Sequence, residues 1–353
     1  MKQNRLKTNV WSIYLLVCIL LLFFAGAGQV FAKDKSVIKL RYGSYAPKTS
    51  IDAPAMWFIE EVSKRSGVKI ELETYFSGTL AKAPDCLSAI GEGVYDIGWL
   101  SSAYTPGKLP LAMMVGSTPL VAKSVYSLLA ATDEVVNTFE PAKAEFKKAK
   151  VKFLFNGGIY HYDYIGTKPI KTLDDIKGVK ARTYGYYSKA WAALGGVPVT
   201  LSITEAYDGI QKGMIDGALT QAFFMVHALR LTEVAKHYTK LDFGCIPAPV
   251  IMNLKTWNKL PEAVQKAMTE VAQEMPKQGA KLIVGPELSA IDTMKKQNVT
   301  INYLSEKDKA QVMKLSKNIS DQLVNDMTAR GVKDAREAMD IYLKALKKAR
   351  AQE

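Results

Sequence analysis

The sequence predicts an α/β protein with two lobes, each built on a doubly wound, mostly parallel sheet that is flanked by helices. Two segments, 38–100 and 173–221, alternate between strand-like and helix-like patterns, which is typical of parallel sheets. Three residue types also recur at an offset of 120 positions, which favours two similar lobes. The pairs are Ile90 and Ile210, Gly93 and Gly213, and Asp96 and Asp216. Ligands of doubly wound sheets bind at the carboxyl ends of strands.

The first 32 residues have the features of a secretory signal peptide. Lys2, Arg5 and Lys7 give a basic start, Val10 to Ala25 is largely apolar, and residues 30–32 fit a cleavage site. The apolar core is shorter than the ~20 residues that a membrane-spanning helix needs. We therefore expect cleavage after Ala32 and export of a soluble protein.

Elements of the first lobe follow from alternation and from helix-stop residues. Ile38, Leu40 and Tyr42 alternate with basic residues and indicate a strand that ends at Gly43. Asp52 is predicted as the N-cap of the next helix. The remaining predicted elements of this part are strands at 70–76, 96–100 and 151–155, and helices at 84–90 and 124–148. A first crossover to the other lobe is expected near Gly157 and Gly158.

The second lobe begins with a strand at 179–184. Thr172 with Asp175, and Ser202 with Glu205, have capping-box spacing for two short helical starts. Further predicted elements are a helix at 187–194, a strand at 217–221, a helix at 225–234 and a return crossover at 244–249. After it we expect a helix at 257–275 that kinks at Pro276, helices at 286–296, 305–331 and 335–350, and a strand at 299–304.

Arg182 lies where the strand at 179–184 runs into a loop, at the mouth of the second lobe. A guanidinium at such a place can hold a carboxylate by two parallel hydrogen bonds. The alternative is a surface salt bridge, which is what most exposed arginines form.

The sequence around Arg182 closely resembles that of one protein family. K-G-V-K-A-R, L-G-G-V-P-V and E-A-Y-D-G-I-Q-K-G-M-I-D-G are similar to the extracytoplasmic solute-binding proteins of TRAP transporters, of the C4-dicarboxylate-binding type. The resemblance implies a two-lobed periplasmic-binding-protein fold, periplasmic localisation and integral-membrane TRAP subunits as partners. It also implies that Arg182 binds the ligand carboxylate. The lobes would comprise 33–157 with 249–285, and 158–248 with 286–353.

Two departures from the family pattern bear on the ligand. Many members carry a second arginine about twenty residues earlier, where this chain has Tyr160-His161-Tyr162-Asp163-Tyr164. The chain also has Thr220-Gln221 where an asparagine is common. Loss of a cationic contact argues against a dicarboxylate or sialic acid. It favours a monocarboxylate whose apolar or aromatic body stacks on the nearby rings.

We therefore expect one ligand site between the lobes. The predicted ligand-binding residues are Arg182, Tyr184, His161, Tyr162, Thr220, Gln221 and Phe223, with Gly78, Trp99 and Ser101 on the opposite wall. About half of the tyrosines and phenylalanines in this region are expected only to pack the core. Ligand binding and closure of the lobes would then present the protein to its membrane partner.

Other classes have less support in the sequence. The three histidines lack metal-ligand spacing, and no nucleophile elbow, P-loop or dinucleotide fingerprint is present, so we expect no metal, no cofactor and no enzyme. The alternatives left open are a secreted enzyme acting on a small carboxylate, and a binding protein for an ABC importer or a sensor.

Charge and cysteines complete the expectations from sequence. Removing three basic residues with the leader leaves 44 Lys and Arg against 34 Asp and Glu, or +10, and these charges are interspersed. We therefore expect no nucleic-acid partner, and a monomer. Cys86 and Cys245 are expected to be buried free thiols.

Overall fold

The computed structural model describes residues 37–101, 104, 107–112, 118–119, 121–122, 124–159, 161–220 and 222–353, without the side chains of 222–224, 316 and 317. The predicted signal peptide lies outside the described residues. Ile38–Glu353 forms one contact-defined unit, which contains two separate sheets. Among the described residues, no helix has the length and apolarity that crossing a membrane requires.

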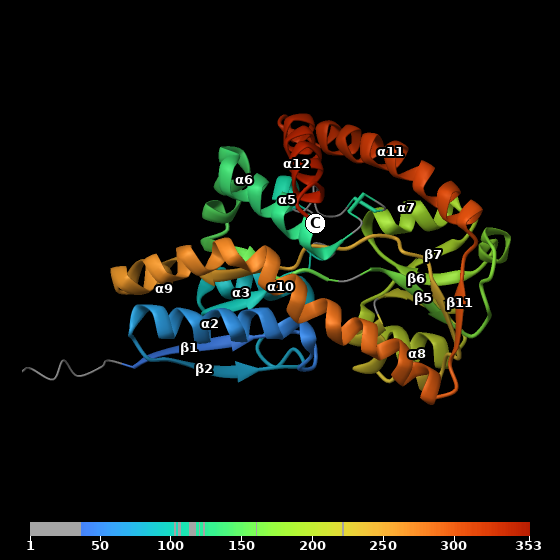
Figure 1. Cartoon of the computed structure of the whole chain (residues 1–353), viewed down its shortest axis with the longest axis horizontal. Coiled ribbons are helices and arrows are strands. Elements are labelled where there is room, and N and C mark those ends of the chain that lie inside the picture. Colours follow the sequence, from blue (N-terminus) through green and yellow to red (C-terminus); the bar gives the residue numbers. More distant parts are fainter. Residues whose placement is uncertain are drawn as a thin grey trace, which may run out of the picture. The chain divides into compact units, whose positions relative to one another are not determined.

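The first sheet has the strand order β2-β1-β3-β10-β4 (Figure 1). Its strands are β1 (Ile38–Gly43), β2 (Ile70–Tyr75), β3 (Ile97–Trp99), β4 (Val151–Asn156) and β10 (Pro249–Asn253). β1 pairs in parallel with β2 and β3, as the doubly wound pattern predicts. Along the chain, α2 (Ala53–Ser66) connects β1 to β2 and α3 (Cys86–Glu92) connects β2 to β3. β10 enters antiparallel between β3 and β4.

The second sheet has the order β11-β9-β5-β8-β6-β7. Its strands are β5 (Asp163–Gly166), β6 (Lys180–Thr183), β7 (Val197–Thr200), β8 (Gly217–Thr220), β9 (His237–Lys240) and β11 (Thr300–Tyr303). β6 is parallel to both β7 and β8, and the connecting helices are α7 (Gly185–Ala193) and α8 (Ala206–Gln211). β5 is antiparallel to β8 and β9, so both sheets are mixed.

Two chain segments connect the sheets and run side by side. The first leaves β4 after Asn156, and the second returns from β9 to β10, where the sequence predicts the crossovers. The amide of Gly157 donates to the carbonyl of Ala248 (2.8 Å), and Ile159 and Ile246 form an antiparallel bridge. The boundaries of the lobes themselves stay a prediction.

The internal repeat corresponds to one structural device used twice. Gly93 and Gly213 follow α3 and α8 with φ of +80° and +70°, a conformation that glycine adopts without strain. Asp96 Oδ2 accepts the amide of Arg41 (2.8 Å), and Asp216 Oδ2 accepts the amide of Lys180 (2.9 Å). Each aspartate therefore ties its own strand entry to the neighbouring parallel strand.

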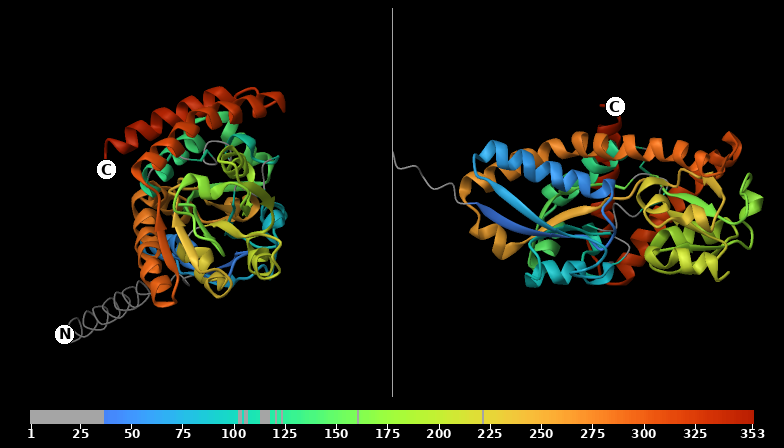
Figure 2. Two further views of the ribbon diagram at one scale, coloured as in Figure 1. Left: turned by 90° about the vertical axis from the view of Figure 1, so that its right-hand side faces the viewer. Right: turned by 90° about the horizontal axis from the view of Figure 1, so that it is seen from below.

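Prolines explain two differences from the predicted helices. The tract at 124–148 is two helices, α5 (Val125–Thr138) and α6 (Glu140–Lys148). Pro141 has no N–H to continue α5, and it lies instead in the first turn of α6, with Phe139 extended between the two helices. Conversely, α10 (Glu262–Lys296) continues through both Pro276 and Pro286, so the two helices predicted there are one. α10 packs on α2 and β4 and reaches β11, which Figure 2 shows as one helix passing both sheets. The proposed lobe boundary at 285 falls inside it.

The two C-terminal helices pack against different parts of the molecule. α11 (Glu306–Ala329) packs against α7, as expected for the second lobe, but α12 (Ala335–Arg350) packs mainly against α5. The apolar face of α12, which includes Met339, Tyr342 and Leu346, joins a cluster with α5 residues. Amphipathicity predicts such a face but does not name its partner. Cys86 and Cys245 are buried free thiols, which confirms that expectation.

Candidate ligand-binding site

Arg182 is held by the three parallel strands of the second sheet. It lies on β6 opposite Val199 of β7 and Ala218 of β8, and only 1% of its surface is exposed. The guanidinium donates to the carbonyls of Leu201 (Nε, 3.0 Å) and Leu219 (Nη1, 3.3 Å) and to the hydroxyl of Tyr104 (Nη2, 3.3 Å). Three of its five N–H groups are thus used, and donors remain for a ligand.

Arg182 has no acidic partner among the described residues. Its Cζ lies 5.1 Å from the centre of the Tyr184 ring, a cation–π contact that offsets part of the cost of burial. A buried charge is ordinarily paired with an opposite charge, because desolvation of an isolated ion is expensive. The candidate site therefore contains a buried positive charge without a counter-charge among the described residues.

Three tyrosines form the second-lobe side of the site. Tyr184 donates its hydroxyl hydrogen to the hydroxyl of Tyr162 (3.1 Å), and the Tyr162 and Tyr187 rings are 5.1 Å apart. Burial raises the pKa of Tyr162 and Tyr184, and the Arg182 charge offsets part of that rise. The Tyr162 and Tyr184 phenols are therefore neutral hydrogen-bonding groups on apolar rings.

The first lobe contributes an aromatic wall that faces Arg182. Tyr104 accepts from Arg182 and, more weakly, from the amide of Ile203 (3.4 Å), so one hydroxyl contacts two parts of the second lobe. The Tyr45 ring lies 5.7 Å from that of Tyr104 and 4.6 Å from that of Trp99. These rings bring the two halves of the predicted cleft into contact.

The buried carboxylate of Asp52 holds Trp99, which packs against this aromatic wall, by a hydrogen bond. Asp52 accepts from the Tyr42 hydroxyl (2.7 Å), Trp99 Nε1 (3.2 Å) and the amide of Thr49 (3.0 Å). Asp52 is the N-cap residue of α2, as predicted, but its side chain makes no capping hydrogen bond with that helix. Burial raises the pKa of Asp52, and the hydrogen bonds from Thr49, Tyr42 and Trp99 limit the rise.

The remaining predicted site residues have varied positions. Trp99 (1% exposed) and Ser101 (6%) are buried in the first lobe, where Trp99 supports Tyr45. The amide of Gly78 donates to the carbonyl of Ser44 (3.1 Å), in the loop after β1. Thr220 is fully buried at the end of β8, next to the Leu219 carbonyl that accepts from Arg182.

His161 lies beside a cavity that Arg182 does not line. His161 Nδ1 lies 3.6 Å from Asp242 Oδ1, beside a separate cavity of about 490 Å³ that Glu306 and Lys309 also line. Gln221 and the side chain of Phe223 lie outside the described residues. The described residues contain no group of three or more His, Cys, Asp or Glu that could hold a metal.

Sequence reasoning missed Tyr45 and Tyr104, which make the nearest first-lobe wall. A signal for both was available, because each follows the carboxyl end of a strand, β1 or β3, where doubly wound sheets place their ligands. Tyrosines are common enough in loops that this position alone did not single them out.

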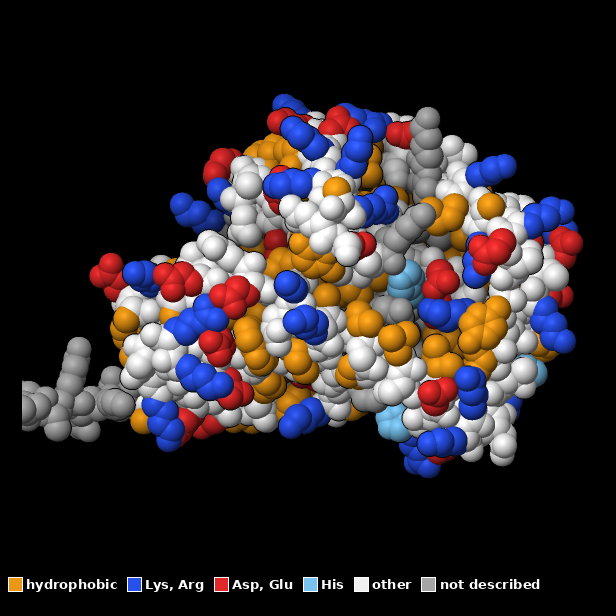
Figure 3. Space-filling model, viewed as in Figure 1, with side chains coloured by type: hydrophobic (Ala, Val, Ile, Leu, Met, Phe, Trp, Pro, Cys, Tyr) orange, Lys and Arg blue, Asp and Glu red, His pale blue; other side chains and the backbone are white. Residues whose placement is uncertain are grey.

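Two sheets joined by paired crossovers, with a buried cation and an aromatic wall between them, define a two-lobed binding-protein fold. The chain belongs to family 7 of the bacterial extracellular solute-binding proteins, whose family model matches residues 43–326. The predicted membership among TRAP solute-binding proteins is confirmed, and the family consists of binding proteins rather than enzymes. Figure 3 shows acidic and basic side chains interspersed on the face in view.

Several relatives illustrate this family. A solute-binding protein of Verminephrobacter eiseniae is 25% identical over 227 residues, which cover 64% of this chain and 66% of that relative, slightly under two thirds. A TRAP periplasmic solute-binding protein from Desulfovibrio salexigens has a TM-score of 0.73 at 26% identity, with 89% of this chain and 96% of that chain covered.

Solved structures of the same fold hold different acids. A marine metagenome TRAP protein specific for aromatic acids, in complex with 3-hydroxybenzoate, has a TM-score of 0.80 at 23% identity and covers 88% and 98% of the two chains. Others hold benzoate, pyroglutamic acid or β-D-galacturonate. The fold is therefore common to receptors for several carboxylates.

Proposed function

We propose that this protein captures an organic acid with one carboxylate, on an apolar or aromatic body, and delivers it to the membrane subunits of a TRAP transporter. The observation that carries the proposal is Arg182, a cation with 1% exposure and no acidic partner among the described residues. A ligand carboxylate supplies the missing counter-charge, and the two nitrogens Nη1 and Nη2 can hold it by paired bonds.

The ligand class follows from what surrounds the arginine. Its described neighbours are carbonyl oxygens and the rings of Tyr104 and Tyr184, and none of its contacts involves a second cation. A second carboxylate on the ligand would thus be buried without a partner, which is costly. Neutral rings with hydroxyl groups suit a flat or apolar body that carries few polar substituents.

Closure of the lobes would complete the site. Tyr104 reaches Arg182 from the first lobe, and the crossovers at Gly157 and Ala248 provide two adjacent strands of backbone about which the lobes can rotate. The acid would use the N–H groups of Arg182 that have no protein acceptor, while Tyr104 keeps its bond to Nη2 and covers the ligand. The closed form is then the state that the membrane subunits bind.

Known ligands of the fold are consistent with this class without selecting one member. Aromatic acids, pyroglutamic acid and a uronate all occupy proteins of this architecture at about 20–23% identity. The choice of cargo therefore depends on the side chains around Arg182, and the aromatic acids match those side chains best.

Calorimetric titration of the mature protein tests the proposal. The panel comprises benzoate, 3-hydroxybenzoate, pyruvate, pyroglutamate, succinate and malate. We expect saturable one-to-one binding of a monocarboxylate, and Arg182→Ala to weaken it by ~2–5 kcal/mol, because the ligand charge then loses its partner. Arg182→Lys should also weaken binding, since an ammonium cannot form the planar fork.

A matched control distinguishes loss of the Arg182 contact from a general change in the charge of the protein. Arg230→Ala removes an exposed arginine of the second lobe that pairs with Glu233, and it should leave the affinity unchanged. Tight binding of succinate with no response to monocarboxylates would contradict the ligand class. Normal affinity in Arg182→Ala would contradict the site itself.

The remaining parts of the proposal concern maturation and delivery. Mass spectrometry of the exported protein should show cleavage after Ala32, and light scattering should show a monomer. Uptake of the bound acid into vesicles that contain the TRAP membrane subunits should require this protein. Uptake that proceeds equally without it would refute the delivery step.

A further inference from the structure

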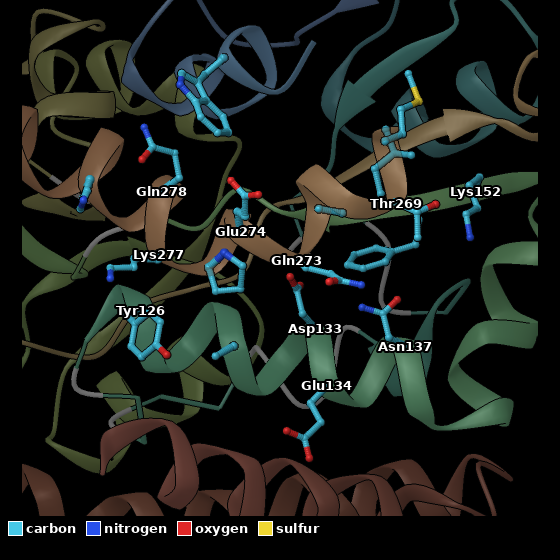
Figure 4. Close-up of a pocket in the computed structure, with 18 of the residues that line it drawn as sticks. Tyr126, Asp133, Glu134, Asn137, Lys152, Thr269, Gln273, Glu274, Lys277 and Gln278 are labelled. Carbon is cyan, nitrogen blue, oxygen red and sulfur yellow. The ribbon is translucent and has the colours of Figure 1, made fainter. Parts of the chain in front are cut away.

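A second cavity lies in the first lobe, apart from the residues around Arg182. It is a groove of about 1000 Å³ between α5, β4, α9 (Leu254–Lys259) and α10, and Figure 4 shows its lining. Its apolar lining includes Phe153, Leu154, Met268, Trp57 and Trp257. This size and lining suit a small molecule with an apolar body. None of the predicted ligand-binding residues that the structure describes lines it.

One buried acid faces this groove. Asp133 of α5 is 8% exposed, and its Oδ1 accepts from the amide of Asn156 (3.1 Å) and from Asn156 Nδ2 (2.8 Å). Its Oδ2 accepts no hydrogen bond from the described residues. In Figure 4 the carboxylate rises from α5 toward α10, with Gln273 beside it and Asn137 further along α5. One half of the carboxylate is therefore fully bonded, and the other half is presented to the groove.

The other acids of the groove already have cationic partners. Glu134 Oε2 lies 3.3 Å from Lys348 Nζ, and in Figure 4 it points away from Asp133. Glu274 Oε1 lies 2.6 Å from Arg65 Nη1. Asp133 has no ion pair with a described residue, and burial raises its pKa to about 7. Four lysines also line the groove, namely Lys152, Lys277, Lys281 and Lys348, but none of them forms an ion pair with Asp133, so a cation that enters would meet an unneutralised acid.

We propose that this groove binds a small organic cation, an ammonium group on an aromatic or aliphatic body. The ammonium donates to Asp133 Oδ2, with Asn137 and Gln273 beside it as further polar groups, and the body lies on Phe153 and Met268. A primary amine has three donors, which suits one carboxylate oxygen and two side-chain amides. The inference is independent of the acid site and of the transport role.

Benzylamine is the probe, with benzyl alcohol as its neutral counterpart, in calorimetric titrations of the mature protein at pH 8. We expect benzylamine to bind saturably and one-to-one, and benzyl alcohol to bind about tenfold more weakly or not at all, because a charged partner strengthens the hydrogen bond. Asp133→Asn keeps the shape and the bonds to Asn156, and it should weaken benzylamine binding by about tenfold or more.

Two further variants make the result specific. Glu134→Gln changes the adjacent acid on the same helix, which has its own partner, and should leave benzylamine affinity unchanged. Ala272→Phe fills the groove from α10 without touching Asp133, and it should also abolish binding. Circular dichroism verifies that each variant is folded. Absence of saturable benzylamine binding, or equal affinity in Asp133→Asn, would overturn the proposal.

Discussion

Replacing Asp133 by asparagine should make the protein more stable at alkaline pH and leave it nearly unchanged in acid. The substitution keeps the oxygen that accepts from the amide and the Nδ2 of Asn156. It removes only the capacity to ionise inside α5, where the side chain is 8% exposed. The difference between the two proteins therefore reports the cost of burying this charge.

The magnitude follows from the pKa. Burial raises the pKa of Asp133 from 3.8 to about 7, although the hydrogen bonds from Asn156 work in the opposite direction. A raised pKa means that the folded state holds the proton more tightly than the unfolded state. The resulting stabilisation is complete below pH 4 and is lost as pH rises through about 7. A difference of one pKa unit between the folded and unfolded states is worth about 1.4 kcal/mol, so the full loss of stability is up to about 4 kcal/mol.

Chemical denaturation of both proteins at intervals between pH 4 and pH 8 measures this effect. We expect the free energy of unfolding of Asp133→Asn to exceed that of the unsubstituted protein by a margin that grows with pH and levels off above pH 7. Other titrating groups, such as Glu145, whose pKa burial also raises to about 7, cancel in the difference. Glu134→Gln serves as the exposed control. A difference that does not change with pH would refute the reasoning.

Two further predictions concern the cleft and the crossovers. Tyr104→Phe removes the hydroxyl that accepts from Arg182 and should weaken binding of the acid ligand by about 1 kcal/mol, or about fivefold, in calorimetry, with the melting temperature unchanged. An unchanged affinity would show that this contact is absent in the liganded form. Asp163→Ala should lower the free energy of unfolding by ~3–5 kcal/mol, because the carboxylate accepts from the amides of residues 241 and 242 and from Tyr238. A loss below about 1 kcal/mol in urea denaturation would contradict that role.

The predicted elements agree with the structure where their signals are local. Capping boxes at Thr172 and Ser202 are both present, and the paired aspartates Asp96 and Asp216 play the same role in the two sheets. Such features depend on residues a few positions apart or on one neighbouring strand. Asp52 shows the limit, because its local pattern indicates a helix cap and tertiary contacts to Tyr42 and Trp99 use the carboxylate instead.

Sequence alone determined the family, the alternation of strands and helices at 38–100, and Arg182 as the candidate anchor, since each depends on short runs of residues. It did not predict β5, β7, β9 or β10. Tertiary structure decided that Arg182 is buried without an acidic partner and that Tyr104, 78 positions away, closes over it. It also decided that α10 stays one helix and that Asp133 faces a groove. The physical reason is that desolvation and partner choice depend on which distant segments pack together, and periodicity along the chain does not contain that information.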